Sequence, residues 1–116
     1  MKNFKNLKVW QIGIELVVKV YRYSQKFPQE EIYGLTSQMR RSAISIPSNI
    51  AEGSGRSSDK DFNRFLDISL GSSFELETQI IIAHKLDFLS ENEFEELNNM
   101  VREEQMMITG LQKSLK

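Results

Sequence analysis

The sequence of 116 residues contains no cysteine and a single histidine, His84. Without cysteine there is no disulfide framework, no thiolate metal site and no thiol nucleophile, which is typical of a protein of the reducing cytoplasm. No apolar stretch approaches the roughly 20 residues that a membrane-spanning helix needs, and the first residues lead into no signal-peptide core. An excess of positive charge is also missing, since 15 Lys and Arg stand against 16 Asp and Glu. The composition therefore predicts a soluble, cytoplasmic protein with no membrane partner, which does not coat nucleic acid by bulk charge alone.

The single histidine also limits the chemistry that the chain can perform. Di-iron helical bundles need Glu-x-x-His on facing helices, whereas Ile81 stands three residues before His84. Zinc sites need further His or Cys ligands, and hydrolytic triads need a nucleophile beside the imidazole. The glycine-rich stretch 53–58 lacks the Lys-Ser/Thr ending of a P-loop. A helix end followed by a helix start explains it better than the alternative, a phosphate site with Arg56. We therefore expect no enzyme, no metal and no cofactor.

Proline and glycine are few, with two and six residues, which leaves room for long helices. Apolar residues spaced by three and four predict helices over about 7–26, 30–52, 59–88 and 91–115. Ser90 and Glu93 match the capping box that opens a helix. Pro47 is expected to kink the second helix, because it removes a backbone donor and crowds a carbonyl. Short connections favour an all-α, antiparallel up-down-up-down four-helix bundle, formed as one domain over residues 1–116.

The first predicted helix is more apolar than a single bundle requires. At 100° per residue it carries two apolar stripes, whereas a surface helix of a monomer usually carries one. One stripe comprises Leu7, Trp10, Ile14, Val17, Val18 and Tyr21, and the other comprises Val9, Ile12, Leu16, Val20 and Tyr23. We expect the second stripe to meet another subunit of a homo-oligomer, with Gly71 and Ser72 letting a neighbouring helix approach. Burial of Val9, Ile12, Leu16 and Val20 inside one protomer would contradict this interpretation.

A particular run of residues links the chain to a known family. From Phe27 to Gly53 it reads FPQEEIYGLTSQMRRSAISIPSNIAEG. The pattern continues with Gly55-Arg56, Phe62, Phe65-Leu66, Gly71-Ser72 and Glu75-Leu76-Glu77, and it begins with Phe4, Leu7, Trp10, Glu15-Leu16 and Tyr21. Over nearly its whole length the chain resembles the four-helix-bundle family of bacterial proteins encoded by 23S rRNA intervening sequences. Relatives of that family include the accessory protein of diversity-generating retroelements.

The resemblance implies a four-helix bundle that assembles into a ring-like homopentamer. It implies no enzymatic activity and no cofactor. It also implies a role linked to nucleic acid, because the genes lie in rRNA inserts and the retroelement relatives pair a basic surface with a reverse transcriptase. The charge of this chain departs from that pattern, since its formal net charge is −1. The nucleic-acid binding of the basic relatives therefore does not carry over intact.

Charge is nevertheless uneven along the chain. Residues 1–26 hold six cations and one acid, whereas from Ser90 onward six glutamates face three cations. The basic first helix is expected to contact phosphates or, as the usual alternative, the acidic last helix of its own or a neighbouring subunit. Either Arg41 or Arg40 is expected to pair with Glu77 or Glu75, within a subunit or across an interface. The candidate contacts to RNA, DNA or a protein partner are Lys19, Arg22, Lys26, Arg40, Arg41, Asn49 and Arg56.

Two functions from different classes follow. The favoured hypothesis is a non-catalytic, homo-oligomeric scaffold, pentameric by resemblance, whose partner is another protein. The alternative is a weak RNA or DNA binder linked to rRNA or to a reverse-transcriptase system. Phosphate contacts would make that binding sensitive to salt.

Overall fold

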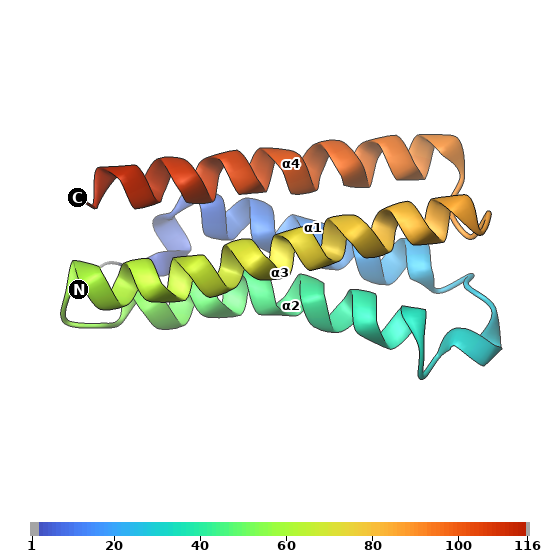
Figure 1. The fold of residues 1–116 in the computed structure, drawn as a ribbon, viewed down its shortest axis with the longest axis horizontal. Coiled ribbons are helices and arrows are strands. Elements are labelled where there is room, and N and C mark those ends of the chain that lie inside the picture. Colours follow the sequence, from blue (N-terminus) through green and yellow to red (C-terminus); the bar gives the residue numbers. More distant parts are fainter. Residues whose placement is uncertain (1–2, 116) are drawn as a thin grey trace.

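The computed structural model describes residues 3–115, so residues 1, 2 and 116 of the predicted domain lie outside it. The fold is all-α, with four helices and, within the described residues, no strand. The helices are α1 (Lys8–Ser24), α2 (Leu35–Ser54), α3 (Asp59–Lys85) and α4 (Glu91–Ser114). Two short 3-10 helices, η1 (Phe4–Asn6) and η2 (Gln29–Glu31), precede α1 and α2. All four long helices run lengthwise along a body of 43 × 24 × 20 Å (Figure 1).

Side-chain caps mark the starts of α3 and α4. Ser58 accepts a hydrogen bond from the Asp61 amide at 3.1 Å and opens α3. The predicted capping box at α4 is present, with Ser90 and Glu93 each accepting the backbone amide of the other. The second helix begins at residue 35 and not near residue 30, because η2 and a turn occupy the intervening residues. There the Glu31 carboxylate accepts the Leu35 amide at 3.1 Å.

Each long helix packs against two others. Helices α1 and α3 both contact α2 and α4, but they do not contact each other within the described residues. In Figure 1, accordingly, α3 lies in front of α1. The enclosed core takes apolar side chains from all four helices, among them the fully buried Leu16, Ile46, Leu66, Ile80 and Leu97. The outer faces of α1 and α3 therefore point to opposite sides of the bundle.

The structure corrects the predicted role of one stripe of α1. Val9, Ile12, Leu16 and Val20 are between 0 and 7 % exposed and belong to the protomer's own core. Their expected contact with another subunit is therefore wrong. Periodicity located both stripes but could not tell which one turns inward, since both are apolar and only packing against α2 and α4 decides. Tyr23 also has a partner within the protomer, because its hydroxyl donates to the Glu96 carboxylate on α4.

The surplus of apolar surface on α1 is still present, but on the other stripe. Ile14 and Val18 are 37 and 42 % exposed, and Trp10, Val17 and Tyr21 are partly exposed beside them. The apolar side chains that α1 leaves uncovered in the protomer are therefore not the ones predicted to meet another subunit.

Pro47 lies inside α2, which continues from residue 35 to residue 54. Its ring is buried and faces α1, because a Cβ built at Gly13 would lie 3.3 Å from the Pro47 Cβ. The kink at this proline stays a prediction. Within the described part of the chain, no helix is both long and apolar enough to span a bilayer.

Candidate interaction surfaces

The exposed stripe of α1 and the neighbouring face of α2 form a groove. One hollow of about 330 Å³ is lined mainly by apolar side chains: Trp10, Ile14, Val17, Ile44, Pro47, Ser48 and Ala51. A second hollow of about 370 Å³ shares Ile44 with the first and is lined by Tyr21, Ile32, Ser37, Arg40, Arg41 and Ile44. We call these two hollows together the α1/α2 groove. Its floor is apolar along most of its length, and two arginines lie at the end near Tyr21.

Arg40 has a role within the protomer. Its Nε donates to the Ser24 Oγ at 2.9 Å, its Nη2 donates to the Tyr21 carbonyl at 3.4 Å, and its guanidinium lies 4.6 Å from the Tyr21 ring centroid. A cation at a helix C-terminus is favoured because the last carbonyls carry partial negative charge. Arg40 therefore holds the end of α1 against α2. Its partners in the protomer are thus Ser24 and Tyr21 and not Glu75 or Glu77.

Arg41 is exposed and, among residues 3–115, has no hydrogen-bonding or ion-pair partner. Its pairing with an acid of its own subunit is likewise absent from the described structure. Two adjacent residues of α2 thus differ: Arg40 has its partners in α1, whereas the charge of Arg41 is unpaired and lines the α1/α2 groove.

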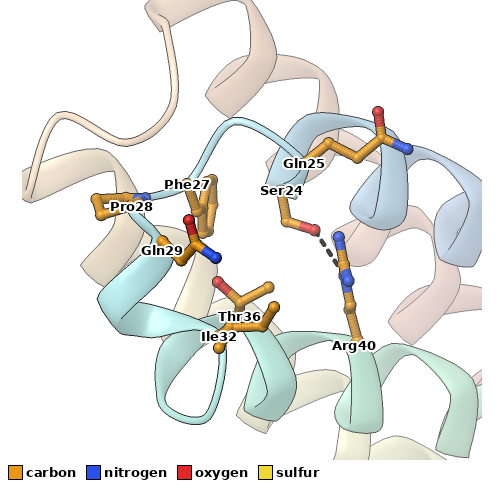
Figure 2. Close-up of a pocket in the computed structure, with 8 residues that line it drawn as sticks. All are labelled: Ser24, Gln25, Phe27, Pro28, Gln29, Ile32, Thr36 and Arg40. Carbon is orange, nitrogen blue, oxygen red and sulfur yellow. Dashed lines mark hydrogen bonds between the residues drawn. The ribbon is translucent and has the colours of Figure 1, made fainter.

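A smaller hollow of about 250 Å³ lies behind Arg40, between the end of α1 and the start of α2 (Figure 2). Figure 2 shows Ser24 and Arg40 on one side of it and Phe27, Pro28 and Gln29 on the other. The Thr36 hydroxyl is buried there without a partner in the described structure. No acidic side chain lines the hollow. Because Arg40 is already bonded to Ser24 and Tyr21, the hollow is best explained as space left where α1 ends.

Apolar side chains are also exposed along α3. The large ones among them are between 37 and 52 % exposed and comprise Ile68, Phe74, Ile81, Ile82 and Leu86. We call this surface the α3 face. Gly71 lies within it, and a Cβ added there would meet no atom within 4 Å. Glu75 is exposed on the same face and has no partner among the described residues.

The small residues predicted to admit another helix have different environments. The Ser72 hydroxyl lies 2.8 Å from the Ser45 hydroxyl on α2, so it joins helices of one protomer. Gly71 borders open space, and its role at an interface stays a prediction. Isolated apolar residues on a protein surface need no explanation, but contiguous patches are typical of interaction sites.

The basic residues of α1 mostly contact α4 of the same protomer. Lys19 lies 2.8 Å from Glu96, and this hydrogen bond raises the pKa of Lys19 and lowers the pKa of Glu96. Lys26 forms an ion pair with Glu93. Of the three cations predicted to contact phosphates, Arg22 alone has no partner within residues 3–115. The acidic last helix of the same subunit therefore neutralises most of this surface.

The remaining candidate contacts are also bonded locally. Arg56 lies 2.8 Å from Glu52 one helical turn away, with its guanidinium 4.6 Å from the Phe65 ring centroid. The Asn49 amide donates to the Ser45 carbonyl at 2.8 Å and to the Ser45 hydroxyl at 2.9 Å. Within residues 3–115 neither side chain pairs with Lys19 or Lys26, and each has a partner within α2.

One polar residue of the core was not identified as functional from the sequence. Glu104 is fully buried, and neither of its carboxylate oxygens has a hydrogen-bond partner in the described structure. Burial, together with the nearby Glu103, raises the pKa of Glu104 to about 8. Its carboxyl group packs on the backbone of α1, since a Cβ at Gly13 would lie 2.9 Å from Oε2. The only sequence signal was a glutamate in an apolar seam position of the last helix.

Comparison with known proteins identifies the family of this chain. Residues 5–110 match the 23S rRNA-intervening sequence proteins. The chain belongs to this family. A crystal structure of a protein of unknown function from the S23 ribosomal protein family of Bacteroides thetaiotaomicron VPI-5482 has the same fold, with a TM-score of 0.83. It shares 24 % sequence identity and covers 90 % of this chain and 98 % of its own. No curated protein matches.

Neither the 23S rRNA-intervening sequence family nor the solved relative is described by a catalytic activity. In this family member the imidazole of His84 stacks on Phe94, with ring centroids 3.9 Å apart, and its Nε2 lies 2.9 Å from the Glu91 carboxylate. These contacts join the end of α3 to the start of α4. Within residues 3–115 no cluster of His, Asp and Glu is arranged to hold a metal ion.

Proposed function

We propose that this 23S rRNA-intervening sequence protein is a non-catalytic, homo-oligomeric scaffold whose copies associate through the α1/α2 groove and the α3 face. The proposed bundle is antiparallel, in up-down-up-down order. The proposed assembly is a closed ring that presents the remaining surface to another protein. The number of copies, five, comes from the family resemblance alone.

Contacts between α2 and α3 support the antiparallel order. A Cβ at Gly53 would touch Phe62, the Ser69 hydroxyl donates to the Ile46 carbonyl, and Ser72 meets Ser45. Residue numbers therefore rise on α3 as they fall on α2. Lys19 and Lys26 of α1 contact Glu96 and Glu93 of α4 in the same reversed order.

Self-association is inferred from one observation: a single chain has two different apolar surfaces. Because α1 and α3 lie across the bundle from each other, the α1/α2 groove and the α3 face are separate surfaces of the protomer. A twofold dimer would use one self-complementary patch, whereas two distinct complementary patches produce head-to-tail contacts that close into a ring or extend into a filament. Exposed Ile, Phe and Trp side chains gain free energy when such contacts remove them from water.

Charge placed on each surface tests the proposal. Size-exclusion chromatography with light scattering should give the unmodified protein a mass well above the 13.5 kDa of one chain. Ile14→Glu in the groove and Ile82→Glu on the α3 face should each reduce it, because burying an unpaired carboxylate is costly. Met106→Glu is the matched control, since Met106 is 74 % exposed on α4. A mass of 13.5 kDa for the unmodified protein at micromolar concentration would refute self-association.

Weak RNA or DNA binding is the second candidate function. It is supported by Arg22 and Arg41, which have no partner within the described chain, and by a family description that refers to 23S rRNA. A gel-shift assay with RNA and DNA should then show binding at low salt that is lost near physiological salt. Replacing Arg22 and Arg41 together by Gln should abolish it. Absence of any shift at low salt would remove this candidate.

A further inference from the structure

We propose that an ion pair between Arg41 of one copy and Glu75 of the next closes each junction, in a ring whose rotation axis is parallel to the bundle. This inference rests on the proposed assembly and specifies its register. The occupant of the α1/α2 groove is thus the α3 face of a second copy of this chain.

Charge complementarity is the first argument. Arg41 lies at the end of the groove near Tyr21, and its side chain has no partner within residues 3–115. On α3, beyond its first turn, Asp67 and Glu77 accept hydrogen bonds from Gln112 and Gln105 of α4, at 2.6 and 2.9 Å. Glu75 is the remaining carboxylate of that part of α3, exposed and unpaired among the described residues. An unpaired cation in one apolar surface and an unpaired anion in the other would both be satisfied by their contact.

The level of each residue along the bundle is the second argument. The Ser45 and Ser72 hydroxyls, 2.8 Å apart, mark positions of equal height on α2 and α3. Arg41 lies four residues before Ser45, and Glu75 lies three residues after Ser72. On antiparallel helices these steps run in the same direction, and at 1.5 Å per residue the two heights differ by only about 1.5 Å. Rotation about an axis parallel to the bundle changes no height, so Arg41 and Glu75 of adjacent copies meet at one level.

Two apolar positions agree with this register. Gly13 and Pro47 are in near contact, which places Ile14 at about the height of Pro47. Pro47 lies two residues after Ser45, and Gly71 lies one residue before Ser72, so their heights also agree to about one residue. Ile14 lines the groove and is 37 % exposed, whereas a Cβ at Gly71 would meet only open space. An exposed apolar side chain and a position without a side chain therefore lie at the same height in the register that joins Arg41 to Glu75.

Charge reversal and its repair within one chain test this pair. Arg41→Glu and Glu75→Arg should each raise the protein concentration of half-assembly, measured by light scattering, by at least about tenfold, because like charges then face each other. The double variant Arg41→Glu/Glu75→Arg should restore assembly, since every junction again joins opposite charges. Arg102→Glu and Glu103→Arg on α4 make the same charge changes on exposed positions and should leave assembly unchanged. Circular dichroism of each variant checks that the exposed substitutions preserve the helices.

The outcomes separate this inference from the proposal on which it rests. If the unmodified protein assembles and both single reversals leave the half-assembly concentration unchanged, the ion pair is wrong while the oligomer stands. If the single reversals weaken assembly but the double variant does not recover, the two residues lie in interfaces without pairing, and the inference is again overturned. If the unmodified protein is monomeric, both the inference and the assembly are overturned.

Discussion

Glu104 gives a sharp prediction about stability and pH. Its pKa in the folded protein is about 8, raised by burial from an ordinary value of 4.5. Unfolding therefore releases this proton at any pH between those two values. The free energy of unfolding is therefore highest below pH 4.5, where Glu104 is protonated in both the folded and the unfolded state. It falls as the pH rises through about 8, because only the unfolded state lets the side chain ionise freely. At ~1.36 kcal/mol per unit, the interval corresponds to a loss of ~5 kcal/mol of unfolding free energy.

Glu104→Gln isolates this contribution, because glutamine has nearly the same shape and does not ionise. The difference in unfolding free energy between the variant and the unmodified protein should grow by ~1.4 kcal/mol per unit between pH 5 and pH 8. A constant offset from burying the amide does not affect this slope. Urea unfolding followed by circular dichroism, at one protein concentration, measures it at each pH.

Glu95→Gln is the matched control, since Glu95 is exposed on the same helix, nine residues away from Glu104. Its unfolding free energy should follow that of the unmodified protein across the same pH range. Parallel curves for Glu104→Gln and the unmodified protein would refute the reasoning, because they would mean that Glu104 is ionised in the fold and has a partner or water that stabilises its charge.

Three further substitutions test the packing. Gly13→Ala should destabilise the fold by ~1–3 kcal/mol in urea unfolding. The added Cβ would lie 2.9 Å from a buried carboxylate oxygen and 3.3 Å from a proline ring. Gly110→Ala, whose Cβ would meet no atom within 4 Å, should instead stabilise the fold by up to ~1 kcal/mol. Ser90→Ala removes the cap of α4 and should cost ~1 kcal/mol, and an unchanged melting temperature would contradict the role of the capping box. Arg40→Gln should loosen the end of α1, seen as faster amide exchange near Ser24, and unchanged exchange would mean that the arginine does not hold this end.

Local patterns in the sequence were sufficient for the number of helices and for the start of α4. The number of helices follows from the apolar periodicity, and the start of α4 follows from Ser90 and Glu93, because both depend on residues within one or two turns. The start of α2 was misplaced because η2 continues the same polar composition without forming an α-helix.

Tertiary contacts decided what the sequence could not. Two stripes of α1 were recognised, but the inward one was assigned to the exterior, since Val9 and Ile14 are equally apolar and only α2 and α4 distinguish them. The partner of Arg40 lies sixteen residues away at the end of another helix, so no spacing rule pointed to it. The burial of Glu104 depends on the absence of a side chain at Gly13, which likewise appears only when α1 and α4 are packed together.

The central claim is that copies of this chain associate head to tail through two different surfaces and close into a ring. Native mass spectrometry at micromolar concentration tests it most directly. The account expects one dominant species with a fixed whole number of 13.5 kDa chains, five by family resemblance. A single chain of 13.5 kDa would contradict the association, and an open-ended ladder of sizes would contradict the closure.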